Sequence, residues 1–391
     1  MNNVLFLASW YPSKVDPFDG DFIERHAKSI SLSNQVYVIY VVKDPSKKNR
    51  EKTIDKEISG NLISFKGYYP LSKSKLKWIE KLHSNLWSFR LHHRIFKTIV
   101  SQYGLPDIVH LNVLMKAGLF ALWLKKKYGL AYVLTENWTG YYPERKDGFN
   151  QQSSLYKFLS KIIYKNCDLP LPVTRDLGRK MNHLFGMAKP FMVIPNVVDT
   201  SLFFPSLVPK NVKKRFIHIS TLGYHKNIYG ILNATEKLYE QRKDFELVLA
   251  GNASAEIVQW TKKHELFNTC IFFTGLISYQ EVAGIFRTAD ALIMFSRYEN
   301  LPCVILEALC SGLPVISTDV GGIREVIHEG NGILIQSEKE DQLCEAMGYL
   351  LDNSQKYSQE KIARSAQEKF NYLAVGNQFN ESYKRVSSAN K

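Results

Sequence analysis

Two glutamates, Glu299 and Glu307, lie eight positions apart between two apolar segments, and their spacing suits ligand chemistry. Residues 291–295 before them and 313–318 after them have the composition of short buried strands. Short buried strands that alternate with helices indicate a parallel sheet. Glu299 is therefore expected at the carboxyl end of a strand, where open α/β sheets bind ligands.

The helix that should follow Glu299 would present an anion-binding end to this position. Asn300, Leu301 and Pro302 open it, and proline suits the first position of a helix. The free backbone N–H groups there, together with the helix dipole, make a site for a phosphate or a diphosphate. Glu307 lies two turns further on and suits the hydroxyls of a ribose, while Glu299 would meet the other end of the ligand. This is the layout of a sugar-nucleotide site.

Length and composition indicate a soluble globular protein. The 391 residues are enough for two domains with separate cores, and 45% of them are apolar while 23% are charged. Five cysteines, an odd number without C-x-x-C spacing, favour a reducing cytosol over disulfides and offer no metal cluster. The apolar run 4–8 is too short for a signal peptide, and no segment approaches a transmembrane span.

The net charge of +14 is concentrated in the first half of the chain. Residues 1–200 hold 30 lysines and arginines against 16 aspartates and glutamates, whereas the remainder holds 21 of each. Such asymmetry points to a nucleic acid or to an anionic membrane surface. Because the sequence lacks helix-turn-helix, zinc-finger and RNA-binding motifs, we expect the membrane surface and no nucleic acid.

Strand and helix patterns alternate along the chain and predict two α/β domains. We place the first at residues 1–196 and the second at 197–374, with a connection around 195–199. The segment 359–385 has apolar residues at helical spacing. Predicted strands are 4–8, 36–42, 62–68, 108–111, 132–135 and 170–173 in the first domain, and 215–220, 246–251, 270–274, 291–295, 315–318 and 332–335 in the second.

The segment around Glu299 and Glu307 resembles the paired-glutamate motif of the retaining glycosyltransferases of family 4. Other segments resemble this family in the expected order, and the likeness covers nearly the whole chain. They are 9–12 with Gly20, 106–110, 133–136, 194–199, Lys226 with Asn227, 273–276, and Gly321 with Gly322. The resemblance implies the GT-B fold, in which two Rossmann-like domains face each other across a cleft. It also implies that a final helix, at about 375–391, crosses back to the first, acceptor-side domain.

The resemblance assigns roles to residues of the second, nucleotide-sugar domain. It implies that Glu299 lies near the donor sugar and the reacting centre, and that Glu307 holds the ribose. Lys226 would face the diphosphate and stabilise the charge of the departing nucleoside diphosphate. Base and sugar would be read by backbone groups and variable loops, such as the loop that begins at Leu276 and residues 300–302.

At one donor-site position the chain departs from the family. The family usually has an arginine where this chain has Thr221, which puts part of the leaving-group clamp in question. His225 or Arg297 could compensate.

Gly20 ends the loop after the first strand, where the family has a glycine-rich loop that faces the cleft. Glycine lets the backbone come close to an anionic ligand. Asp19 and Asp21 around it form a D-x-D pattern, which binds a divalent metal in another glycosyltransferase fold. That pattern normally follows an internal strand, so we expect these aspartates to cap the next helix and expect no metal.

The acceptor side of the cleft should include His110, Asn137 and Tyr141. His110 and Asn137 end or follow predicted strands, and Tyr141 lies in the next loop. The family commonly has histidine where this chain has Asn137; asparagine can bind a sugar hydroxyl but cannot hold a proton or a positive charge. For His110 a buried structural role is an equal alternative.

Basic and apolar residues interleave from residue 68 to residue 100, with Trp78, Leu82 and Trp87 among the apolar ones. Such a basic amphipathic stretch suits a membrane surface. A core-facing helix with a solvated basic side is the alternative.

The sequence thus predicts a cytoplasmic, peripheral membrane glycosyltransferase of bacterial polysaccharide biosynthesis. It would transfer a hexose or an N-acetylhexosamine from a nucleoside diphosphate sugar, with retention, to a lipid-linked acceptor. No cofactor or metal is expected. A GT-B nucleotide-sugar epimerase is one alternative, which Asn137 disfavours because epimerisation needs acids and bases. A non-catalytic glycosyltransferase-like subunit is another, prompted by Thr221 and Asn137.

Overall fold

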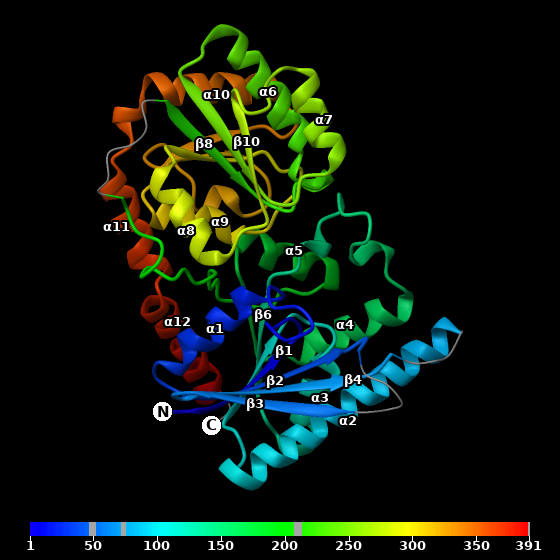
Figure 1. The fold of residues 1–391 in the computed structure, drawn as a ribbon. Coiled ribbons are helices and arrows are strands. Elements are labelled where there is room, and N and C mark those ends of the chain that lie inside the picture. The colour runs from blue at the N-terminus through cyan, green and yellow to red at the C-terminus, as the bar shows by residue number, and fades with distance from the viewer. Residues whose placement is uncertain (47–51, 72–75, 207–212, 390–391) are drawn as a thin grey trace.

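The structure, a computed structural model, describes residues 1–46, 52–71, 76–206 and 213–389. Two α/β domains face each other, and each has one sheet with helices packed on it (Figure 1). In the described residues no helix is both long enough and apolar enough to cross a membrane. The predicted pair of Rossmann-like domains is confirmed.

The first domain has a seven-stranded sheet in the order β3-β4-β2-β1-β5-β6-β7, parallel except for the pairing of β3 with β4. Its strands are β1 (Asn3–Ala8), β2 (Gln35–Lys43), β3 (Thr53–Ser59), β4 (Leu62–Tyr69), β5 (Ile108–Asn112), β6 (Tyr132–Glu136) and β7 (Leu169–Pro172). Its helices are α1 (Asp21–Ser31), α2 (Lys77–Tyr103), α3 (Gly118–Tyr128), α4 (Ser154–Asn166) and α5 (Arg175–Phe185).

The second domain has a six-stranded parallel sheet in the order β10-β9-β8-β11-β12-β13. Its strands are β8 (Lys214–Ile219), β9 (Phe245–Ala250), β10 (Ile271–Gly275), β11 (Ala291–Met294), β12 (Val315–Thr318) and β13 (Gly332–Ile335). Its helices are α6 (Ile228–Gln241), α7 (Ala255–Lys263), α8 (Tyr279–Thr288), α9 (Cys303–Cys310), α10 (Glu340–Asp352) and α11 (Gln359–Phe370), and α12 (Tyr372–Ala389) ends the chain.

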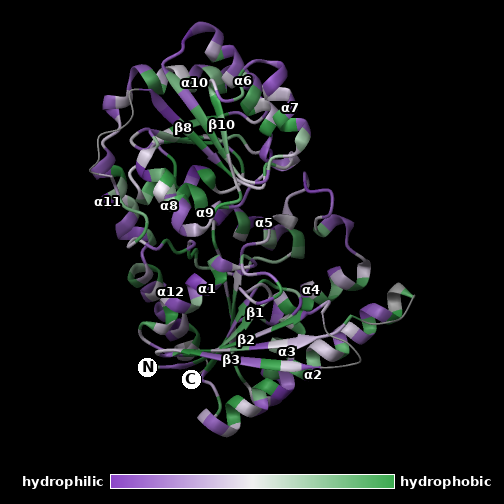
Figure 2. Ribbon diagram, in the orientation of Figure 1, coloured by the Kyte–Doolittle hydropathy of each residue, from purple (hydrophilic) through white to green (hydrophobic). Residues whose placement is uncertain are grey.

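Strand β1 shows why the apolar runs were good strand signals. Val4, Phe6 and Ala8 are buried in the core beneath α1 and α12, whereas Leu5 and Leu7 are buried in the core on the opposite face. A strand covered on both faces needs apolar residues at every position. Figure 2 accordingly shows hydrophobic residues along the central strands of both sheets.

Helix α12 crosses back to the first domain, as predicted. Val375, Phe379 and Tyr383 lie one turn apart and pack into the core that holds β1 and α1. At Gly376 a Cβ atom would lie 2.5 Å from the Ser29 carbonyl oxygen, so α12 approaches α1 closely.

The predicted helical segment 359–385 is two helices, because Asn371 interrupts it. Asn371 has extended backbone (φ −67°, ψ 164°), and its side chain accepts a hydrogen bond of 2.8 Å from the Ala374 N–H. It therefore ends α11 and caps α12. The edge strand β3 was not predicted, because it is mostly polar and partly exposed and so lacks an apolar pattern.

Buried histidines should make the first domain sensitive to acid. Burial lowers the pKa of His26 to about 3 and that of His92 to about 4 from an ordinary 6.5. In the second domain it lowers the pKa of His218 to about 4. At these histidines the unfolded chain binds protons more readily than the folded chain. The free energy of unfolding is therefore highest above pH 6.5 and decreases as the pH falls towards the lowered pKa values. Each histidine should cost about 2 kcal/mol between pH 7 and pH 5.

His110 is also buried in the first domain, and burial lowers its pKa. Three of these four histidines therefore lie in the first domain, and at low pH they reduce its stability. Urea unfolding at pH 7.5 and pH 5.5, followed by circular dichroism, should show an earlier transition at the lower pH. In His92→Phe the difference between the two pH values should shrink. An unchanged difference would show that His92 titrates normally.

Candidate active site

Glu299 and Lys226 meet at the carboxyl edge of the second sheet. Lys226 ends a 3-10 turn (Tyr224–Lys226) after β8, and Glu299 lies in the loop after β11, the neighbouring strand. The Lys226 ammonium donates to Glu299 Oε1, which also accepts a hydrogen bond of 3.0 Å from the Ser296 hydroxyl. Both side chains are largely buried, so Lys226 and Glu299 form a buried ion pair at the carboxyl edge of the second sheet.

The helix predicted after Glu299 is present and begins one residue later than expected; anion binding at this end stays a prediction. Helix α9 begins at Cys303, because Pro302 has the extended backbone of an N-cap (φ −61°, ψ 128°). No side chain caps this end of α9. Leu301 is buried, and Asn300 Nδ2 donates to the Asn137 carbonyl oxygen at 3.0 Å, across the domain boundary. The loop before α9 therefore contacts the first domain.

The two residues predicted to compensate for Thr221, Arg297 and His225, both have other partners in this structure. Thr221 is exposed in the loop after β8. Arg297 binds the carboxylate of Glu338 at 2.8 Å and the Tyr224 carbonyl oxygen. His225 stacks on Tyr298, and burial, with the adjacent Lys226 charge, lowers its pKa. Compensation for Thr221 by either residue stays a prediction.

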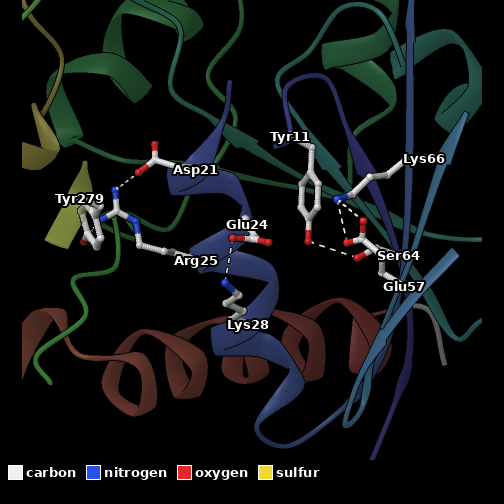
Figure 3. Close-up of polar contacts among 9 residues, drawn as sticks. All are labelled: Tyr11, Asp21, Glu24, Arg25, Lys28, Glu57, Ser64, Lys66 and Tyr279. Atoms are coloured by element: carbon white, nitrogen blue, oxygen red, sulfur yellow. Dashed lines mark hydrogen bonds and ion pairs between the residues drawn. The ribbon is translucent and has the colours of Figure 1, made fainter. Parts of the chain in front are cut away.

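Glu307 is bound by an arginine that sequence reasoning missed. Its carboxylate accepts a hydrogen bond of 2.7 Å from Arg25 Nη1, which also donates to the Tyr279 hydroxyl; Arg25 Nη2 pairs with Asp21 at 3.0 Å. Figure 3 shows Arg25 of α1 between Asp21 and Tyr279. Asp21 and Arg25 have the spacing of a helical ion pair, but no sequence pattern places α1 against α8 and α9.

Gly20 brings α1 into this position. It is the N-cap of α1 with φ +71°, and a Cβ atom there would lie 2.5 Å from the Trp10 carbonyl carbon. Asp19 accepts from the Tyr40 hydroxyl at 3.1 Å, and Asp21 pairs with Arg25. Neither aspartate makes the predicted cap of α1, because each side chain is engaged elsewhere.

His110 does not face the cleft. It is fully buried; its Nδ1 lies 2.6 Å from the Tyr383 hydroxyl and its Nε2 lies 2.7 Å from Thr135 Oγ1. The alternation of β5 directs this side chain towards α12, so the structural alternative holds. Asn112, at the end of β5, was not among the predicted site residues. It is 1% exposed, and neither polar atom of its side chain has a partner in the described structure.

Tyr141 does not line an acceptor opening either. It is buried and donates to Glu136 at 3.0 Å. Glu136 also accepts from the N–H groups of Leu114, Asn137 and Trp138, each at 2.9 Å, and so holds together the loops after β5 and β6. These donors compensate for the burial of its carboxylate.

The adjacent Tyr142 is the tyrosine that reaches across the cleft. Its hydroxyl lies 2.7 Å from Asp176 and 3.1 Å from Asn300 Oδ1 of the second domain. Next to it, a cavity of about 680 Å³ lies between α5 and the loop after β12. The cavity is lined by Arg175, Asp176, Arg179, Asp319, Gly321, Arg324 and Glu325. It offers charged groups of both signs beside the Glu299 loop.

Leu276 is 79% exposed in the loop between β10 and α8. The carboxyl edge of the second sheet carries several of the predicted donor groups of this domain. Lys226 follows β8, the Leu276 loop follows β10, and Glu299 and the start of α9 follow β11. Of the predicted donor-site residues, Glu299 and Lys226 touch directly, and Glu307 pairs with Arg25 of α1, the helix whose N-cap is Gly20.

Two Rossmann-like domains that face each other, with charged groups gathered between them, make the predicted GT-B architecture. Residues 34–202 match the model of Glycosyltransferase Family 4, and residues 199–369 match that of Glycosyl transferases group 1. The chain belongs to glycosyltransferase family 4.

Known proteins agree with this assignment. The chain is 24% identical over 366 residues to the "Putative teichuronic acid biosynthesis glycosyltransferase TuaC" of Bacillus subtilis (strain 168), covering 88% of each chain. Sucrose-phosphate synthase from Thermosynechococcus elongatus has the same fold, with a TM-score of 0.78 at 18% identity over 100% of both chains. Anabaena HepE in complex with UDP-glucose superposes with a TM-score of 0.69 at 16% identity, over 98% of this chain and 100% of that one.

Proposed function

We propose that the protein transfers a hexose or an N-acetylhexosamine from a nucleoside diphosphate sugar, with retention of configuration. The acceptor is a lipid-linked glycan of bacterial polysaccharide assembly, reached at the cytoplasmic face of the membrane. Transfer needs no cofactor and no divalent metal.

The ion pair of Lys226 and Glu299 at the start of α9 carries this proposal. An ammonium group has three donors, so Lys226 can keep its bond to Glu299 and still bind a phosphate oxygen. The uncapped end of α9 supplies backbone donors and a favourable dipole to the same diphosphate. Glu299 is then placed at the sugar end, where its remaining lone pairs can accept from sugar hydroxyls.

In the reaction, the bond between the anomeric carbon and the diphosphate oxygen breaks, and both electrons leave with the diphosphate. Lys226 and the α9 N–H groups stabilise that charge. The acceptor hydroxyl forms the new bond to the same face of the anomeric carbon. Its proton passes to the departing phosphate oxygen, so no protein base is required. This path is consistent with asparagine at position 137.

Two relatives support the classes of donor and product. A nucleotide sugar, UDP-glucose, is the ligand named for the HepE structure, and the TuaC name places that relative in teichuronic acid biosynthesis. We extend both by proposal to a nucleotide sugar and a surface polysaccharide here.

A thermal shift panel of UDP-, GDP- and ADP-sugars, with and without EDTA, tests the donor site. A ligand of the native state raises the melting temperature by mass action. We expect one nucleotide to raise it, with EDTA present or absent, and Glu307→Ala to abolish the rise. No rise with any donor would contradict the proposal and favour a non-catalytic subunit.

Two helices of the first domain could contact a membrane. In α2, the second half packs into the core, whereas Leu82 and Leu86 of the first half are exposed beside basic side chains. This half of α2 extends beyond the sheet in Figure 1. In α4, Leu155 and Phe158 are 66% and 60% exposed, and lysines 161 and 165 are exposed on the same helix. Exposed apolar residues among lysines suit an anionic membrane surface.

For the basic stretch 68–100, the second half of α2 has the predicted core-facing side, and membrane binding by the first half stays a prediction. Residues 72–75 of the stretch lie outside the described part. The full chain should sediment at low salt with vesicles of phosphatidylglycerol and phosphatidylethanolamine, and much less with phosphatidylcholine vesicles. Exchange of Leu155 and Phe158 for serine should reduce sedimentation. Failure to sediment with the anionic vesicles would contradict membrane association without affecting the donor proposal.

A further inference from the structure

A buried ionic cluster joins the two domains at Glu307. Arg25 and Glu307 have side chains that are 5% and 6% exposed, and they belong to α1 of the first domain and α9 of the second. The guanidinium lies 4.9 Å from the centre of the Tyr279 ring, next to the Leu276 loop. Its charge also acts against the rise in pKa that burial causes at the Cys303 thiol, one turn before Glu307 on α9. Arg25 thus touches the parts of the second domain proposed to bind the nucleotide.

Glu307 depends on this arginine for its charge and its orientation. Burial raises the pKa of Glu307, and the positive charge of Arg25 acts against that rise. An ionised carboxylate accepts at both oxygens and donates at neither, which suits two neighbouring ribose hydroxyls that both donate. Arg25 Nη1 donates to Oε1 at 2.7 Å, and the Tyr279 hydroxyl lies close to the same carboxylate. The remaining lone pairs of the carboxylate are then available to ribose hydroxyls.

We propose that Arg25 is a positioning residue for nucleotide recognition: it holds Glu307 in the ionised, oriented form that reads the ribose hydroxyls. The inference rests on the proposed function and goes beyond it by assigning ribose recognition to both domains. Because Arg25 belongs to the first domain, Glu307 is set for ribose only when the domains are closed as they are here. Ribose recognition and domain closure are then one event.

Paired ribo- and deoxyribonucleotides test this role. Calorimetric titration with UDP and 2′-deoxy-UDP, and with GDP and 2′-deoxy-GDP, gives the ratio of the dissociation constants for each pair. For the nucleotide that binds wild type, the deoxy form should bind roughly 10- to 100-fold more weakly, the effect of one hydrogen bond to a charged group. In Arg25→Gln the ratio of the dissociation constants of the deoxy and ribo forms should fall to the ratio measured for Glu307→Gln. The double variant should show no further decrease in this ratio. Arg25→Lys, which keeps a positive charge, should restore part of the ratio.

Lys66 provides a matched control within the same domain. It is also a buried cation paired with a glutamate, Glu57 at 2.8 Å, and Figure 3 shows it apart from Arg25. Lys66→Gln should leave the ribo-to-deoxy ratio unchanged. An Arg25→Gln variant that discriminates like wild type would overturn the role of Arg25 and leave the donor site intact. Tighter binding of both nucleotides by Arg25→Gln would also overturn it, because Arg25 would then compete with the ligand. If wild type bound no nucleoside diphosphate, the proposed function itself would fail.

Discussion

Replacement of Lys226 by methionine should lower kcat by about 100- to 1000-fold while the protein stays folded. Lys226 is the cation that touches Glu299 at the carboxyl edge of the sheet, and in the proposed reaction it faces the departing diphosphate. Removal of one well-placed donor to a developing charge typically costs this much in kcat. Methionine keeps the apolar stem and removes the charge, so the loss reports mainly on the ammonium group.

The measurement is steady-state kinetics with the donor that the thermal shift panel identifies. Lys237→Met is a suitable control, because Lys237 forms a similar ion pair, with Asp341, on the exposed side of the same domain. It should retain the wild-type kcat. If Lys226→Met also kept the wild-type rate, Lys226 would not stabilise the leaving group, and another cation would have to be sought.

Replacement of Gly322 by alanine should prevent the domains from closing and lower kcat/KM by about 10- to 100-fold. A Cβ atom at this position would lie 2.1 Å from Thr174 Cγ2, which belongs to the first domain. The backbone of Gly322 (φ −91°, ψ 7°) is accessible to alanine, so the second domain itself should fold normally. The clash acts between domains, and forced overpacking of this kind costs about 1–3 kcal/mol.

Kinetics and small-angle scattering together test this prediction, since an open cleft should increase the radius of gyration. A compensating change offers the strongest control: Thr174→Gly removes the clashing side chain and should restore much of the activity to Gly322→Ala. Thr174 caps α5, but glycine at a cap costs only a few tenths of a kcal/mol. Gly348→Ala, whose Cβ would meet its nearest neighbour at 3.7 Å, should behave like wild type. Full activity of Gly322→Ala would mean that this contact is not part of the active state.

Local patterns in the sequence were sufficient for the two sheets and for the core of the donor site. Parallel strands covered on both faces need continuous apolar runs, so the residue types of β1, β11 and β13 were enough to predict these strands. The ends of such strands carry the ligand groups, which is why both Lys226 and Glu299 were predicted at the donor site, whereas their direct contact is seen only in the structure. Both properties depend on a few neighbouring residues along the chain.

The tertiary structure alone decided which side chains face the cleft and which cross it. His110 turned out to be structural because the alternation of β5 directs it to α12, a helix 273 positions later in the sequence. Glu307 is bound by Arg25 because the two domains dock, and the partners are separated by 282 positions. No local periodicity encodes contacts between surfaces of separate domains, because such contacts join residues that are far apart along the chain. Short-range patterns were thus enough to predict the two domains and the strand-end positions of Lys226 and Glu299. The pairing of Glu307 with Arg25 required the docking of the two domains.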